Sequence, residues 1–181
     1  MDIVYKIMLA LGFAALTGLM AQIRIVLPFS PVPITGQTLA VLLAGVVLGR
    51  WGGVSMTMYV GFGIAGVPWF TNWQGGLGSL TGATGGYLLG FIFAASFVGF
   101  MTERYVRSRK TLPLLGILLF SNFVLIYLPG LLVLYTWWGE VIGPITLMKL
   151  LSIGAVPFIV GDLFKIAVTV GLARSILPSR T

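Results

Sequence analysis

Cysteine and histidine are both absent from the 181 residues, and only 8% of the residues are charged. The missing thiols and imidazoles exclude disulfides, the usual zinc sites and nucleophiles of the Cys–His or Ser–His type. No G-x-x-x-x-G-K-[ST] phosphate loop occurs, so ATP hydrolysis by this chain alone is not expected. The acidic residues are too scattered to form an evident carboxylate pair for acid–base catalysis. We therefore expect no enzyme activity, no metal and no cofactor. The acidic residues are Asp2, Glu103, Glu140 and Asp162.

Apolar residues make up 58% of the chain, and the mean hydropathy is +1.06. Soluble domains carry about 25% charged residues, so this chain lacks the polar surface needed to face water on all sides. A helix needs about 20 apolar residues to cross a hydrocarbon core of about 30 Å, and apolar stretches of this kind follow one another closely. We therefore expect one membrane domain over residues 1–181, an all-α bundle of six transmembrane helices. The first apolar stretch lacks a cleavage site and is predicted to be a retained helix.

Prolines, glycines and charges mark the boundaries of the six predicted helices. Three prolines exclude a helix in Pro28–Gln37, a tight turn is expected at Arg50–Gly53, and a kink is expected near Pro129. Pro68–Gly86 contains six glycines, two tryptophans and no charge, so it is predicted to be an unusual extracytoplasmic loop between the third and fourth helices. The helices are expected at residues 3–26, 38–49, 54–67, 87–102, 112–138 and 150–173.

The basic residues predict how the chain is oriented in the membrane. Six spans would place eight Lys and Arg residues on the side of both termini and two on the other side, so both termini are predicted to be cytoplasmic. The net charge of +7 is explained by this topology, and nucleic-acid binding is not expected. Glu103–Lys110 is interpreted as a topology anchor, with binding of anionic lipid or a partner as the alternative. The eight are Lys6, Arg50, Arg104, Arg107, Arg109, Lys110, Arg174 and Arg180, and the two are Arg24 and Lys149.

Asp162 and Lys165 are the strongest local indication of a site. They are three residues apart on a predicted helix, so their side chains project from one face and can meet. Either charge at membrane depth costs about 2.5–3.5 kcal/mol on insertion scales, which favours a functional role in binding a polar, uncharged head group. The alternatives are a structural ion pair or a lysine that reaches toward the membrane interface.

The Gly-rich loop is the second candidate site. Its glycines allow close approach of the backbone to a ligand, and Asn72 supplies hydrogen-bond donors and acceptors. Trp73 offers a flat apolar face, with a place in the interfacial aromatic belt as the alternative, and that belt is the favoured interpretation for Trp69.

A stripe of small residues on the first helix is the third feature. Ala10, Ala14 and Gly18 share one face and allow close contact with another helix. Most such stripes serve packing within a bundle, and docking of a partner is the alternative.

Three motifs follow one another along the chain: VPITGQTLAVLLAG at Val32–Gly45, GGLGSLTGATGGYLLGF at Gly75–Phe91 and VGDLFK at Val160–Lys165. Together they are highly specific and resemble the BioY family, the biotin-binding S components of energy-coupling factor (ECF) transporters. The resemblance spans most of the chain. Ala83 departs from it, since many relatives have proline there, and this should alter loop rigidity more than ligand chemistry.

The resemblance implies a six-helix S component in the bacterial cytoplasmic membrane, with a biotin pocket near the outer surface. Its partners would be a transmembrane coupling subunit, two ATPase subunits and membrane lipid, and it would topple within the membrane to deliver its ligand. It also favours partner docking through Ala10, Ala14 and Gly18.

With biotin as the ligand, Asp162 would accept from the ureido ring, and Lys165 would donate to the ring carbonyl or pair with the valerate carboxylate. Trp73 and Tyr87 would cover the sulfur-containing ring. The other predicted ligand-binding residues are Asn72, Gln37, Thr35, Thr84 and Gly85. The alternatives are an S component for another small vitamin and a non-transporting structural membrane subunit.

Overall fold

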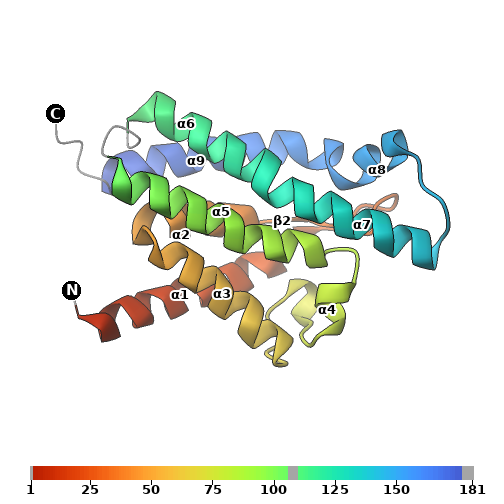
Figure 1. Cartoon of the computed structure of the whole chain (residues 1–181), viewed down its shortest axis with the longest axis horizontal. Coiled ribbons are helices and arrows are strands. Elements are labelled where there is room, and N and C mark those ends of the chain that lie inside the picture. Colours follow the sequence, from red (N-terminus) through yellow and green to blue (C-terminus); the bar gives the residue numbers. More distant parts are fainter. Residues whose placement is uncertain (1, 106–109, 177–181) are drawn as a thin grey trace.

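The computed structural model of the chain describes residues 2–105 and 110–176. Long helices lie side by side along one axis and form a bundle (Figure 1). Four helical segments in the described ranges are long and apolar enough to cross a membrane: Ile3–Gln22, Gly85–Arg104, Thr111–Val141 and Leu147–Ser175. The prediction of an all-helical membrane protein is therefore confirmed at this level.

The elements follow the predicted order, with additions in the connecting segments. They are α1 (Ile3–Gln22), β1 (Arg24–Ile25), β2 (Ile34–Thr35), α2 (Gln37–Leu48), α3 (Trp51–Ile64), the 3₁₀ turn η1 (Thr71–Trp73), α4 (Gly78–Thr81), α5 (Gly85–Arg104), α6 (Thr111–Phe120), the π-helical turn η3 (Ser121–Ile126), α7 (Tyr127–Val141), α8 (Leu147–Gly154), the 3₁₀ turn η4 (Val156–Phe158) and α9 (Ile159–Ile176).

The two ends of the bundle differ in what they carry. One end, at the left of Figure 1, holds the start of α1, the turn from α2 to α3, the end of α5, the start of α6 and the end of α9. The other end holds α4, the segment around β2 and the connection from α7 to α8. Helix α5 packs against α2, α3, η3 and α7, so it is the central helix of the fold.

Helix α1 ends at Gln22, four residues before the predicted end. The chain then pairs Arg24 with Thr35 and Ile25 with Ile34 in a short antiparallel ladder. This ladder satisfies backbone groups that a longer helix would have used.

The predicted turn at Arg50–Gly53 is shorter than expected, because α3 already begins at Trp51. Gly49 makes the turn with φ of 59°. Gly52 serves helix packing instead, since a Cβ there would lie 2.7 Å from the carbonyl oxygen of Ala44.

The last two predicted helices are interrupted. The π-helical turn begins at Ser121, before the predicted kink site at Pro129, and helix continues on both sides of it. The final helix is divided at Ala155, and Pro157 occupies the first turn of the 3₁₀ segment that follows. Arg107, Arg109 and Arg180, which the predicted orientation used, lie outside the described residues.

Candidate ligand-binding site

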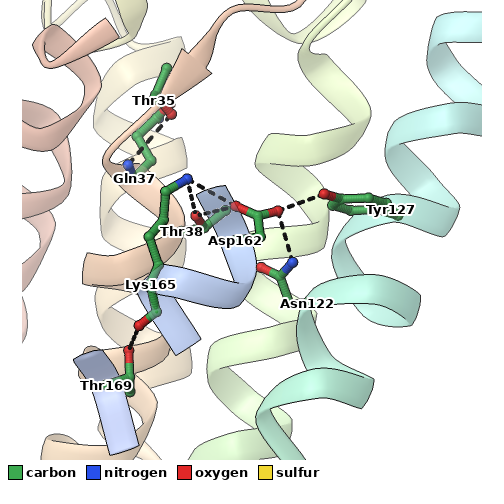
Figure 2. A network of polar contacts seen from close by, with 8 residues as sticks. All are labelled: Thr35, Gln37, Thr38, Asn122, Tyr127, Asp162, Lys165 and Thr169. Carbon is green, nitrogen blue, oxygen red and sulfur yellow. Dashed lines mark hydrogen bonds and ion pairs between the residues drawn. The ribbon is translucent and has the colours of Figure 1, made fainter. Parts of the chain in front are cut away.

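Asp162 lies in the first turn of α9, and only 2% of its surface is exposed. Its Oδ1 accepts hydrogen bonds from Lys165 Nζ at 2.9 Å and Thr38 Oγ1 at 3.2 Å. Its Oδ2 accepts from Tyr127 Oη at 2.6 Å and Asn122 Nδ2 at 2.9 Å. These donors come from α2, η3, α7 and α9 (Figure 2). Four donors match the lone pairs of an ionised carboxylate, so the buried charge is compensated.

Lys165 completes the charged pair from the same helix. Its Nζ lies 2.9 Å from Asp162 Oδ1 and 3.0 Å from Thr38 Oγ1. An ammonium group has three N–H donors, so these two bonds leave one for a further acceptor. The lysine side chain is 14% exposed, compared with 3% for the aspartate. The base is therefore the more accessible partner of the pair.

A second polar network lies around Gln37, at the start of α2. Gln37 Nε2 donates to the Tyr59 hydroxyl at 2.8 Å, and Gln37 Oε1 accepts from Thr35 Oγ1 at 2.9 Å and Thr71 Oγ1 at 3.4 Å. The Tyr59 hydroxyl donates to the carbonyl of Trp69 at 3.3 Å. These bonds connect the Gly-rich segment to α2 and α3.

A cavity lies between these two networks. Its non-atom space is about 700 Å³ when the open mouth is counted, and residues of both networks line it, among them Gln37, Thr71 and Asp162. Its apolar wall includes Leu88, Phe91, Ile126 and Phe158. An apolar wall with a few converging polar groups suits a ligand that has a compact polar head and an apolar body.

Six of the nine predicted ligand-binding residues line this one cavity. Tyr87 does so from α5, and its hydroxyl also donates to the carbonyl of Gly154 at 2.6 Å, which connects α5 to the end of α8. The six come from three separate parts of the sequence. They are Thr35, Gln37, Thr84, Tyr87, Asp162 and Lys165.

The sequence profile of the BioY family matches residues 2–181. The chain belongs to the BioY family. The "Probable biotin transporter BioY" of Methanothermobacter thermautotrophicus is 50% identical over 141 residues, covering 75% of this chain and 88% of that protein. The "Biotin transporter BioY" of Thermotoga maritima is 36% identical over 162 residues, covering 89% of each chain.

A solved structure agrees with this assignment. The S-component for biotin from an ECF-type ABC transporter superposes with a TM-score of 0.83 at 25% identity, over 95% of this chain and 90% of that one. Membership in a family of transporter subunits confirms the prediction that the chain is not an enzyme. Together with the apolar helices, it identifies a multi-pass membrane protein.

The other three ligand-binding residues predicted for this BioY protein lie outside the lining of the cavity. Asn72 Oδ1 accepts from Arg24 Nη2 at 2.7 Å, and Trp73 is 62% exposed. Both residues have a positive backbone φ, 66° for Asn72 and 57° for Trp73. Residues other than glycine seldom adopt this backbone conformation. Gly85 is required for packing, since a Cβ there would lie 1.6 Å from the Leu80 carbonyl oxygen.

The small-residue stripe of α1 faces the interior of the protein. Ala10 and Ala14 are fully buried, and the carbonyl of Ala10 accepts from Ser55 Oγ at 2.6 Å. A Cβ on Gly18 would lie 2.9 Å from Trp69 Cβ. This placement corrects the expectation that these residues are presented to a partner, because α3 and the Gly-rich segment already cover them.

Three of the four donors to Asp162 were missed from the sequence: Thr38, Asn122 and Tyr127. Asn122 carried a usable signal, because a lone amide in an otherwise apolar span is costly unless it is bonded inside the bundle. Thr38 and Tyr127 carried none, since both residue types are common in membrane helices and at their ends.

Proposed function

We propose that this BioY protein is the high-affinity biotin-binding S component of an ECF-type vitamin uptake transporter. The observation that carries the proposal is the buried pair of Asp162 and Lys165 on the wall of a cavity that also has apolar side chains in its lining. Family membership and the names of the relatives support biotin as the ligand.

The proposed contacts follow from the chemistry of the cavity. The biotin ureido group has two N–H donors and one carbonyl acceptor, which complement the carboxylate of Asp162 and the free N–H of Lys165. Thr35, Gln37 and Thr84 would supply further polar contacts and Tyr87 an apolar face. We propose that Asn72 and Trp73 contact biotin only from the rim, and that Gly85 contributes through the backbone. A site built for a ureido group rejects analogues without it, because its own buried groups would be left unpaired.

The proposed architecture is a single domain over residues 1–181 with six transmembrane segments. Four of the six are the long segments, and α2 and α3 are the other two. These two helices have 12 and 14 residues and are about 18–21 Å long at 1.5 Å per residue. We propose that both termini are cytoplasmic. Arg50 precedes α3, Lys110 precedes α6 and Arg174 lies in the last turn of α9. These helix ends lie at the end of the bundle where α1 begins, and basic residues favour the cytoplasmic side, which supports this orientation.

The proposed partners are a transmembrane coupling subunit and two ATPase subunits, with membrane lipid around the assembly. The sequence supports a separate energy source because it contains no phosphate-binding loop. The likeness to an S component of an ECF-type transporter supports the same assembly. Docking through Ala10, Ala14 and Gly18 is not part of the proposal, since those residues are buried.

A thermal-shift screen of vitamins on the purified protein tests this function. A ligand that binds only the folded state stabilises it by about 4 kcal/mol at a thousand times its Kd, so biotin should clearly raise the unfolding temperature. Stabilisation by a different vitamin would instead identify an S component for that compound. If no vitamin raises the unfolding temperature, the chain is a structural subunit and the proposal is wrong.

A further inference from the structure

The segment between α6 and α7 is a π-helical turn, Ser121–Ile126. Turns of this type are rare and are frequently found at functional sites. Two residues of this region donate to Asp162 Oδ2: Asn122 lies within the turn, and Tyr127 immediately follows it. Figure 2 shows both side chains approaching the same oxygen from one side.

Ordinary α-helix would not allow this pairing. Five residues at about 100° each would place the side chains of positions 122 and 127 about 140° apart around the helix axis. In a π-helical turn the hydrogen bond joins residues five apart, which brings them back to the same side. The wide turn is therefore what makes Asn122 and Tyr127 neighbours.

Helix α5 has a notch that receives this turn. A Cβ on Gly90 would lie 2.6 Å from Ile126 Cα, and a Cβ on Gly86 would lie 2.0 Å from the Pro129 carbonyl oxygen. Only glycine at both positions allows the backbones to approach this closely. The paired glycines of α5 thus accommodate the turn and the residues that follow it.

The side-chain amide of Asn122 is only partly hydrogen-bonded. Its Nδ2 donates to Asp162, while its buried Oδ1 has no hydrogen-bond partner among the described residues. The opposite orientation of the amide would set an oxygen against the carboxylate. An unpaired buried oxygen is rare in folded proteins and requires an explanation, and orientation of the carboxylate supplies one.

We propose that the π-helical turn is a positioning device for the ligand site. It aligns Asn122 and Tyr127 so that both hold Oδ2 of Asp162, and this fixes Oδ1 toward Lys165 and Thr38 at the cavity. Asn122, which is not part of the cavity lining, is therefore a positioning residue that acts on the ligand through the carboxylate. The ring of Tyr127 lines the cavity, and its hydroxyl has the same positioning role. The inference rests on the proposed function, since it names what sets the geometry of the biotin site.

Biotin titrations of the full-length protein in detergent test this role. Tyr127→Phe and Asn122→Ala should each weaken binding by about three- to tenfold, the scale of one hydrogen bond to a charged group that acts indirectly. Val124→Ala is the matched control, because it alters the same turn at a half-exposed side chain; it should change the Kd by less than about twofold. Unfolding temperatures without biotin establish that each variant is folded, and Tyr127→Phe retains its ring if Asn122→Ala proves unstable.

A double-mutant cycle separates positioning from general support of the fold. Biotin is titrated to concentrations that also saturate the weakened Asp162→Asn site. In that background Tyr127→Phe should change the Kd by less than about twofold, because the oxygen it positions is already altered. Equal weakening in both backgrounds, or unchanged binding in both single variants, would overturn the inference. Failure of the wild-type protein to bind biotin would instead overturn the proposed function.

Discussion

Two ion pairs of this BioY protein show how differently the same chemistry behaves at two places in one bundle. Asp162 and Lys165 lie 2.9 Å apart with side chains 3% and 14% exposed, and the acid has three further donors. Arg50 and Glu103 lie 3.8 Å apart with side chains 61% and 49% exposed. The buried pair is constrained by four elements of the fold. The exposed pair has one further hydrogen bond, from the Arg50 backbone N–H to Glu103 Oε2 at 2.9 Å, and the Arg50 guanidinium lies over the Phe100 ring.

The comparison teaches where charge carries function in this protein. An exposed ion pair contributes about 0–1 kcal/mol and is weakened by salt. Loss of one partner from a buried pair leaves an uncompensated charge, which costs about 3–5 kcal/mol. A membrane protein with so few charged residues retains a buried pair only where the surroundings stabilise it or a ligand needs it.

The largest effect is expected at the buried pair. Asp162→Asn or Lys165→Ala should weaken biotin binding at least about tenfold, the loss of roughly one charge-assisted hydrogen bond. Isothermal titration in detergent measures this, and Glu103→Gln is the control for loss of a charge elsewhere. Unchanged affinity in both buried-pair variants would remove the pair from the ligand site.

An added methyl group should also be tolerated less well beside the buried pair than elsewhere in the bundle. Gly90→Ala forces a methyl group against the backbone of Ile126 and should destabilise the protein by about 1–3 kcal/mol, the usual cost of overpacking. Gly116 is also within a helix, but a Cβ there meets nothing within 4 Å. Gly116→Ala should therefore be neutral or slightly stabilising. Similar unfolding temperatures for the two variants would show that the π-helical turn is not tightly seated on α5.

A smaller effect is expected in the network that holds the Gly-rich segment. Tyr59→Phe removes the hydroxyl that accepts from Gln37 and donates to the Trp69 carbonyl. We expect a loss of about 1 kcal/mol in unfolding free energy and faster hydrogen exchange of the backbone amides near Thr71. Unchanged exchange in this segment would mean that other contacts hold it.

The smallest effect is expected at the exposed pair. Glu103→Gln should change the unfolding free energy by less than about 0.5 kcal/mol, and the difference should shrink further at high salt. Chemical unfolding at two salt concentrations measures this. A loss as large as that expected for the buried pair would remove the contrast between the two pairs.

The sequence predicted the features that depend on local spacing. Asp162 and Lys165 are three residues apart, so their meeting on one face follows from helix geometry alone, and the apolar runs predicted an all-helical membrane protein. The approximate helix positions followed from prolines and glycines, although several ends shifted by a few residues.

Features that depend on the folded bundle could not be obtained in this way. Tyr127 is 35 residues from Asp162 along the chain. Its approach to the carboxylate requires a π-helical turn, which no residue pattern in the sequence predicted. The stripe of Ala10 and Ala14 was compatible with either an inward or an outward face, and only the placement of α3 decides between them. Glycine at position 85 suggested close approach of a ligand. In the structure, a side chain at this position is instead excluded by the backbone of Leu80.

The acid and the base of the site belong to one helix, and this has a consequence for any motion of the protein. Because Asp162 and Lys165 are separated by a single turn of α9, a displacement of α9 carries both charges together and keeps them neutralised. The bonds from Asn122, Tyr127 and Thr38 cross to other helices, so a displacement of α9 would break bonds from uncharged donors and leave the ion pair intact. A displacement of α9 would therefore leave no isolated charge in the hydrocarbon.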